Sequence, residues 1–294
     1  LLSSVIGVTL DTFRDTSVLL GKDNRPVRRT IIWCDQREAD TGKKLPAFQR
    51  FAFGLAGVMR SIDAVRRKVK PSWVKQNEPE VWAKVTHVVQ ISAYLNYKLT
   101  GSLCDSVAST IGHIPFDYKN KKWLTEKGLT FPVYDLPLSM MIPVVDPGEV
   151  LGKVSAEAHK QSGIPEGLAV YASGSDKGCE TLGVGCLNKN VASVSFGTSC
   201  SVQFSTKDYF EPEPFMPAYP AVLPQYYNPE VQIFRGYWMI SWFKEQFAKD
   251  LVEKAEKEGK IAEDYLNEEI KNIPAGCEGL VLQPFWQAGL TNPE

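Results

Sequence analysis

Short β-rich runs alternate along the chain with longer stretches in which apolar residues follow helical spacing. The run "SVIGVTL" at residues 4–10 is apolar and β-branched, which is typical of a buried strand. Residues 16–35 hold two more strand-like runs around the turn-forming "GKDNRP", so they predict a hairpin followed by a strand. From Asp35 to about Ile62 the spacing becomes helical.

The clearest helical pattern lies at residues 78–101, "EPEVWAKVTHVVQISAYLNYKLTG". Its apolar residues fall mostly on one helical face. Pro79 suits the first helical position, and Gly101 supplies a stop signal. The pattern therefore predicts one continuous helix.

Further along the chain, strand and helix patterns follow each other closely. Residues 167–173 predict a strand, and residues 176–187 predict a helix directly after it. Residues 190–206 contain two β-rich runs broken at "GTS", which predicts a hairpin. Strands interleaved with helices indicate an α/β fold.

The last third of the chain begins with a proline-rich stretch. Residues 209–230 contain six prolines and are not expected to form a regular element. We interpret them as an arm lying over the surface, with a lid as the alternative. Residues 237–259 and 262–273 predict two helices, whose Lys and Glu runs are most simply solvated faces.

Composition narrows the range of partners. The 294 residues are enough for two domains, and 44% of them are hydrophobic. The net charge is −1 with no basic block, which argues against nucleic acid or an anionic membrane as a partner. Six cysteines without a CxxC pair, with three scattered histidines, do not form a zinc-site pattern. This cysteine usage fits a reduced, cytoplasmic setting. No signal peptide or apolar run of about 18 residues is found, so we expect no membrane-spanning segment.

Both ends of the sequence are typical of an incomplete domain. The chain opens without Met, directly on the approach to a strand, and it closes on a loop, "QPFWQAGLTNPE". We therefore expect these residues to be a fragment of a longer protein.

Asp176 is the first candidate for chemistry. It lies within "YASGSDKGCETLGVG", where small residues surround the carboxylate and a helix follows a strand. Open α/β sheets bind ligands at this edge, and a helix N-terminus favours the ionised acid. Such a carboxylate can accept a proton from a hydroxyl that attacks phosphorus. The alternative is an N-cap aspartate with glycines that serve packing, and spacing alone leaves both open.

A second candidate is the turn "SFGTSC". Gly197, Thr198 and Ser199 would expose backbone N–H groups and two hydroxyls, which can hold phosphate oxygens. Gly197 follows Asp176 by 21 residues (197 − 176), across one helix and one strand. That separation predicts a base and a phosphate-binding turn on opposite sides of one cleft.

Two further segments carry paired charges. Arg14 and Asp15 offer a donor and an acceptor at the start of a strand-like run, which suits neighbouring sugar hydroxyls; a surface ion pair is the structural alternative. In "IIWCDQREAD" we favour structural roles: Asp35 caps a helix, Arg37 pairs with it, and Trp33 packs.

Together these segments resemble the FGGY family of carbohydrate kinases, in the family's order. "IGVTLDTFRDTSVLLGKDNRPVRRTIIWCDQR" is similar to the substrate loop, hairpin and "WxDxR" segment. "AYLNYKLTGSLCDSVAST" resembles the "DYLxxxLTG…D.S.AS" stretch, "GSDKGCETLGVG" the "GxxDxxxxxxGxG" motif, and "SFGTS" the loop that opens the second domain. The resemblance covers nearly the whole chain.

The resemblance implies two actin-like, ribonuclease-H-like domains, incomplete here, that phosphorylate a sugar or polyol with ATP and Mg²⁺. It places the sugar-binding domain at residues 1–187 and the start of the ATP-binding domain at 188–294. It implies that Asp176 is the general base, that Arg14 and Asp15 bind the sugar, and that Gly197, Thr198 and Ser199 bind ATP phosphates. A homodimer is common in such families. The sugar itself is not identified.

The chain departs from the family pattern in two respects. Ala93 stands where the family usually has Asp, so a contact there is missing or moved. The family's "DxGT" phosphate hairpin would precede Leu1, and its adenine site would follow Glu294. We therefore expect these residues alone to fold poorly and not to turn over ATP. A non-catalytic sugar-binding or regulatory relative is the main alternative, whereas no "GxGxxG" supports a dehydrogenase.

Overall fold

A computed structural model of the chain describes residues 4–197, 200–212, 216–233 and 236–282. The chain divides into two compact units. The first holds the residues up to Ser193 together with Gln203–Glu230, and the second holds Val194–Val202 and the residues from Val231 onward. The domain boundary expected after Leu187 stays a prediction.

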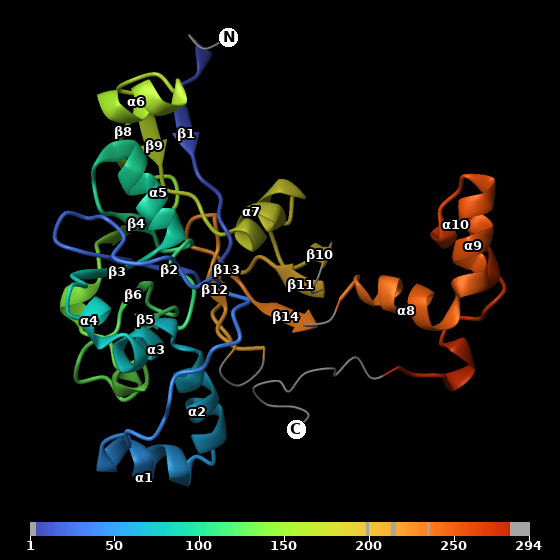
Figure 1. The fold of residues 1–294 in the computed structure, drawn as a ribbon, viewed down its shortest axis with the longest axis horizontal. Coiled ribbons are helices and arrows are strands. Elements are labelled where there is room, and N and C mark those ends of the chain that lie inside the picture. Colours follow the sequence, from blue (N-terminus) through green and yellow to red (C-terminus); the bar gives the residue numbers. More distant parts are fainter. Residues whose placement is uncertain (1–3, 198–199, 213–215, 234–235, 283–294) are drawn as a thin grey trace. The chain divides into compact units, whose positions relative to one another are not determined.

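The first unit contains a small mixed sheet in which β9 (Ala169–Tyr171) is the central strand (Figure 1). β1 (Gly7–Thr9) pairs with it in parallel, and β8 (Val150–Lys153) pairs in antiparallel fashion. The strands predicted at residues 4–10 and 167–173 are thus confirmed, although both are short. α6 (Ala156–Ser162) follows β8, and its Ala158 packs in one core cluster with Val170.

The hairpin predicted in residues 16–35 is only partly present. β2 (Ser17–Leu20) leads into a turn in which Gly21 N donates to Arg25 O at 2.9 Å. Only isolated bridges follow the turn, at Pro26 and Ile31. The antiparallel partner of β2 is instead β3 (His87–Gln90), far along the sequence.

The single helix predicted at residues 78–101 is wrong. The segment forms α4 (Pro79–Trp82), then β3, then α5 (Ile91–Thr100). The β-branched run around Val88 and Val89 favours a strand, and the buried edge of β2 supplies its hydrogen bonds. Both end signals are nevertheless confirmed, because Pro79 begins α4 and Gly101 ends α5 in the left-handed conformation, with φ of 79°.

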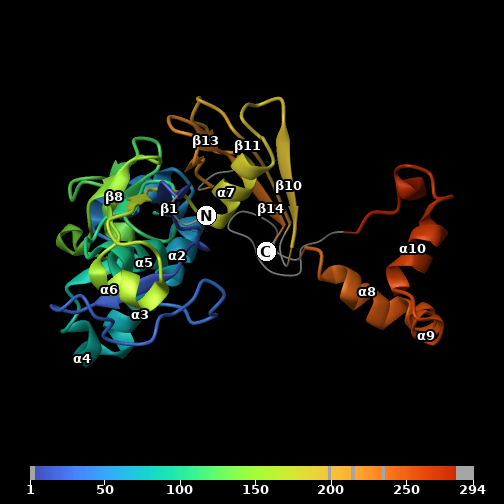
Figure 2. The ribbon, with the colours of Figure 1, turned by 90° about the horizontal axis from the view of Figure 1, so that it is seen from above.

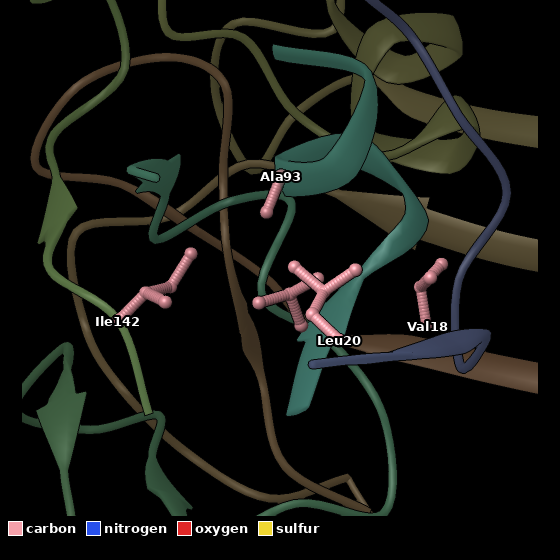
Figure 3. Close-up of a cluster of buried hydrophobic side chains, with 5 residues drawn as sticks. Val18, Leu20, Ala93 and Ile142 are labelled. Atoms are coloured by element: carbon pink, nitrogen blue, oxygen red, sulfur yellow. The ribbon is translucent and has the colours of Figure 1, made fainter. Parts of the chain in front are cut away.

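Ala93, in α5, lies in the core formed with β2 and β3 (Figure 3). Its side chain is fully buried in a cluster with Val18, Leu20, Val89 and Ile142. The position that the family usually gives to Asp is therefore apolar here, and a carboxylate would be buried among aliphatic side chains.

The helix predicted from Asp35 to about Ile62 begins later than expected. Residues 35–46 are irregular, and three helices follow: α1 (Ala47–Leu55), α2 (Met59–Lys68) and α3 (Lys70–Asn77). The buried Lys70 explains the irregular start, because its Nζ donates to Asp35 O at 2.6 Å and Arg37 O at 2.8 Å. Those carbonyls are thereby held by a side chain from outside the segment.

The structural roles expected for Trp33, Asp35 and Arg37 are confirmed in one case out of three. Arg37 Nε pairs with Asp35 Oδ1 at 2.7 Å. Asp35 caps no helix; its carboxylate accepts from the nearby Arg37 N in a local turn. Trp33 is 52% exposed, so it does not pack in the core.

The remaining elements of the first unit are short and connect these layers. They are β4 (Asp105–Ser106), β5 (Phe116–Asp117), β6 (Lys122–Trp123), η2 (Phe131–Val133), η3 (Leu138–Met140), β7 (Val144–Val145), α7 (Asp176–Gly183), β12 (Tyr219–Pro220) and β13 (Tyr227–Asn228). β4 pairs with β7 in parallel, and β5 with β6 in antiparallel fashion.

The proline-rich stretch contains more regular structure than predicted. β12 and β13 form an antiparallel pair within it. Ala218 and Ala221 are buried, and Tyr227 Oη donates to Lys119 O at 2.6 Å. The described part of residues 209–230 is thus an arm packed on the first unit, as we favoured.

Three strands that belong for the most part to the second unit form a sheet, and the second unit also contains three helices. The strand order is β10 (Ala192–Phe196), β11 (Cys200–Phe204), β14 (Glu230–Ile233), and Figure 2 shows the three strands side by side. α8 (Met239–Phe247), α9 (Lys249–Glu258), α10 (Ala262–Ile270) and the short η4 (Cys277–Gly279) follow. The two β-rich runs are confirmed, but the helix predicted at 237–259 breaks at Ala248, where φ is −136°.

All six cysteines are free thiols. Within the described residues, no cluster of three or more His, Cys, Asp or Glu side chains could hold a metal ion. No described helix has both the length and the apolar character needed to cross a bilayer.

Candidate active site

Asp176 is the first residue of α7, directly after the edge of the β1–β9 sheet. An isolated parallel bridge between Thr12 and Ser175 extends that sheet, and Asp176 N donates to Thr12 O at 2.9 Å. Ser175, not Asp176, is the N-cap, because Ser175 Oγ accepts from Gly178 N. The capping alternative for Asp176 is therefore wrong.

The Asp176 carboxylate is accessible and only partly bonded. Its side chain is 38% exposed. Oδ1 accepts from the adjacent Lys177 N at 2.8 Å, and Oδ2 has no hydrogen bond to any described residue. One oxygen is thus oriented by the helix start while the other can accept a proton.

The small residues around Asp176 serve packing. A methyl group at Gly174 would lie 2.4 Å from Val222 Cγ2, and one at Gly178 would lie 3.1 Å from the same atom. Val222 belongs to the proline-rich arm, so the glycines let that arm approach α7. The part of the alternative interpretation that assigned these glycines to packing is confirmed.

Arg14 is held by side chains from two distant segments, the arm and the start of α7. Its NH1 donates to Glu230 Oε2 at 2.5 Å, its Nε donates to Ser175 Oγ at 3.1 Å, and its guanidinium lies 5.0 Å from the centre of the Tyr219 ring. Arg14 Nε is 4.0 Å from Asp176 Oδ1. Burial acts against the charge on Arg14, but Glu230, Tyr219 and Asp176 together outweigh it, and the pKa of Arg14 lies above its ordinary value.

Asp15 faces a different neighbour. Its backbone is in the left-handed region, with φ of 51°, and its N–H donates to Ile111 O at 2.9 Å. Oδ1 accepts from His113 N at 2.8 Å, and Oδ2 lies 2.7 Å from His113 Nδ1. The surface ion pair considered for Arg14 and Asp15 does not form, because each residue has partners of its own.

Sequence patterns did not indicate Glu230 or His113. Glu230 is 216 residues from Arg14, and no local motif links the two. Asp11 was also missed, although an acid two residues beyond a strand was a usable signal. Burial, and then the charges of Asp176 and Glu180, raise the pKa of Asp11.

The predicted phosphate turn is described only at its first residue. Gly197 lies in the second unit, and its carbonyl accepts from Tyr237 N at 2.8 Å. Thr198 and Ser199 lie outside the described residues. Their role, and the cleft expected between Gly197 and Asp176, stay predictions.

The first unit also has a surface cleft of about 530 Å³ that contains none of the predicted site residues. Leu45 and Val133 contribute apolar walls, and Asp135 binds both Lys43 and Lys75 at its rim. It is therefore separate from the Arg14, Asp15 and Asp176 site.

Comparison with known proteins supplies the family. The profile of the "FGGY family of carbohydrate kinases, N-terminal domain" matches residues 2–183. The chain is 31% identical to the "Uncharacterized sugar kinase YgcE" of Escherichia coli K12, an alignment that covers 98% of this chain and 51% of that protein.

Solved structures share the fold. The xylulose kinase of Rhodospirillum rubrum matches 96% of this chain at a TM-score of 0.73 and 21% identity, and the chain covers 55% of that protein. The gluconate kinase of Lactobacillus acidophilus matches 94% at a TM-score of 0.71 and 18% identity, with 54% of it covered. The fold is the actin-like, ribonuclease-H-like α/β fold of sugar kinases, and the chain spans about half the length of these relatives.

Proposed function

The chain belongs to the FGGY family of carbohydrate kinases, and we propose that its protein transfers the γ-phosphoryl group of ATP to a hydroxyl of a small sugar or polyol. The observation that carries this proposal is the Asp176 carboxylate. It starts α7, is 38% exposed, and leaves Oδ2 without a hydrogen bond to a described residue. A carboxylate in that state suits the acceptance of a proton from an attacking hydroxyl.

The residues beside Asp176 have complementary tasks in this proposal. Asp176 orients the acceptor hydroxyl and takes its proton as the oxygen attacks phosphorus. Arg14, whose charge is balanced by Glu230, keeps N–H groups available for a sugar oxygen. Asp15 accepts hydrogen bonds on the sugar side. Gly197, Thr198 and Ser199 contact ATP phosphates through backbone N–H groups and hydroxyls.

A divalent cation such as Mg²⁺ fits the charge of this site. Burial, and then the negative charges of Asp176 and Glu180, raise the pKa of Asp11. A divalent cation would relieve the repulsion between these carboxylates. One or two carboxylates are enough for Mg²⁺, which keeps water and phosphate oxygens as its other ligands. Asp11 and Asp176 are the carboxylates that would face it. When bound, Mg²⁺ offsets the negative charge that develops on the transferred phosphoryl group.

The wider setting is proposed on the sequence alone. A cytoplasmic location, a homodimer, and the lack of nucleic-acid and membrane partners follow from composition and from the family resemblance. The substrate stays at the level of a class, because names among the matched structures include both xylulose kinase and gluconate kinase.

The test is a phosphotransfer screen of the full-length protein against polyols, ketoses, aldoses and sugar acids with ATP and Mg²⁺. Sugar phosphate and ADP should appear in equal amounts for one class of acceptor. A parallel thermal-shift series without ATP reports sugar binding by itself. Binding of a sugar without any phosphorylated product would contradict the proposal and support the non-catalytic alternative.

A further inference from the structure

The turn at residues 111–113 is wrapped around Asp15. Ile111 O accepts from the Asp15 backbone, and His113 donates its N–H to Oδ1 and places Nδ1 beside Oδ2. A left-handed backbone at a non-glycine residue costs free energy, and here the turn holds it in place. The turn therefore fixes both the backbone and the carboxylate of Asp15.

Gly112 is required for this approach. A methyl group there would lie 2.6 Å from Asp15 Oδ1 and 3.1 Å from Asp15 Cα. Behind the turn, the Tyr118 hydroxyl accepts from Gly112 N and donates to Gly112 O, each at 3.0 Å. Burial raises the pKa of Tyr118 well above its ordinary value, so the hydroxyl keeps the proton that it donates.

The contact with Asp15 selects a tautomer of His113. An ionised carboxylate only accepts hydrogen bonds, so the ring nitrogen 2.7 Å from it carries the proton. In the neutral ring the other nitrogen, Nε2, is then an acceptor. The His113 side chain is 26% exposed, and Nε2 has no hydrogen bond to a described residue. The arrangement matches the carboxylate–imidazole pairs in which an acid fixes the tautomer and orientation of a histidine that contacts a ligand or substrate.

We propose that His113 Nε2 accepts a hydrogen bond from a hydroxyl of the sugar or polyol, and that Asp15 is its orienting partner. The inference rests on the proposed kinase function and adds a substrate-contacting residue to the same site. The ligand must supply a hydroxyl donor at this position. A substrate analogue that lacks that hydroxyl leaves Nε2 unpaired, and unpaired polar groups are what discriminate such analogues.

Two substitutions of His113 distinguish a substrate contact at Nε2 from a purely structural role beside Asp15. The amide nitrogen of His113→Asn can replace the Nδ1–H that faces Asp15, but it leaves nothing at Nε2. The longer His113→Gln side chain can place its amide oxygen near Nε2 and loses the bond to Asp15. For the acceptor found in the phosphotransfer screen, we expect KM to rise about 10-fold or more in His113→Asn, with kcat within a few-fold. His113→Gln should restore part of the lost affinity.

The monodeoxy analogues of that acceptor complete the test. For the analogue that lacks the contacted hydroxyl, His113→Asn and wild type should have equal KM. His159→Asn, an exposed position on α6, is the matched control and should change neither constant. Melting temperatures of the variants identify a folding defect. Nitrogen NMR of the wild type should show His113 protonated at Nδ1, with its signals assigned by their loss in His113→Asn.

The outcomes are distinct. If wild type phosphorylates an acceptor but KM is unchanged in His113→Asn, or His113→Gln is the weaker variant, the contact with Nε2 is excluded. A proton on Nε2 in the NMR spectrum also overturns it. If wild type phosphorylates no acceptor, the proposed function fails first and this inference fails with it.

Discussion

Arg14 and Asp176 approach within 4.0 Å of each other, yet the molecule holds them by different means. The Arg14 side chain is 18% exposed and is bound by Glu230 and Ser175, which come from distant segments. Asp176 is 38% exposed and is oriented by its own helix start. The Arg14 charge is thus neutralised by a buried partner, whereas the Asp176 carboxylate is left partly unbonded, a difference that suits the roles we propose for them.

The two side chains therefore depend on different parts of the structure. Arg14 depends on long-range packing, because the arm must be in place before Glu230 reaches it. The Asp176 carboxylate is oriented mainly by the local start of α7, with the Ser175 cap before it and one backbone hydrogen bond to Thr12 O. Changes in the arm should therefore disturb Arg14 first, and changes in the α7 start should disturb Asp176 first.

The largest effect on stability is expected from Glu230→Gln. Glu230 is 3% exposed, and its loss leaves the Arg14 charge without its buried partner. We expect the free energy of unfolding to fall by about 3 kcal/mol, measured by denaturant unfolding. Glu180→Gln is the control, because the Glu180 side chain is 45% exposed in its pair with Lys177, and it should cost less than about 1 kcal/mol. Equal losses in both variants would contradict the account of Arg14.

Gly174→Ala should have the next largest effect. Its methyl group would lie 2.4 Å from Val222 Cγ2, and overpacking of this kind costs about 2 kcal/mol. Val222→Ala should recover much of that loss in the double variant. Gly183→Ala in the same helix meets no atom within 4 Å and should be neutral or slightly stabilising. An absence of recovery in the double variant would refute the packing role of Gly174.

Ser175→Ala tests the residue that contacts Arg14 and also caps the helix that carries Asp176. Its hydroxyl caps α7 and accepts from Arg14, so its loss should cost about 1 kcal/mol of unfolding free energy. Ser175→Asn, which can also cap a helix, should cost less. If thermal unfolding of Ser175→Ala matches wild type, the cap contributes little to the start of α7.

The smallest effect is electrostatic and concerns Asp11. Asp176→Asn removes one of the negative charges that raise the pKa of Asp11, so that pKa should fall, as an NMR titration of the Asp11 carboxyl can measure. Because folding raises the pKa of Asp11, the protonated carboxyl stabilises the folded protein at low pH. That stability is lost as the pH rises through the pKa of Asp11 in the folded protein. The Asp176→Asn variant should therefore lose less stability over that range. Asp23→Asn, in the exposed turn after β2, is the control and should leave the pKa of Asp11 unchanged.

The same contrast explains what sequence patterns could predict. The strand at β9 and the helix at α7 were predicted because strand composition and helix starts are local signals. The strand β3 was missed within a helical pattern, since its pairing with β2 is decided by residues about 70 positions away. Glu230 and His113 were missed for the same reason, because an ion pair or a hydrogen bond between distant segments has no local pattern.

The central claim is that Asp176 accepts the proton of the acceptor hydroxyl. Its most direct test is the kcat of Asp176→Asn in the full-length protein, with sugar binding measured in parallel by thermal shift. We predict that kcat falls at least about 100-fold while the sugar-induced shift is retained, because the amide keeps the shape but cannot take the proton. A kcat within a factor of about two of wild type would contradict the claim, since such a change is far below the contribution of a general base.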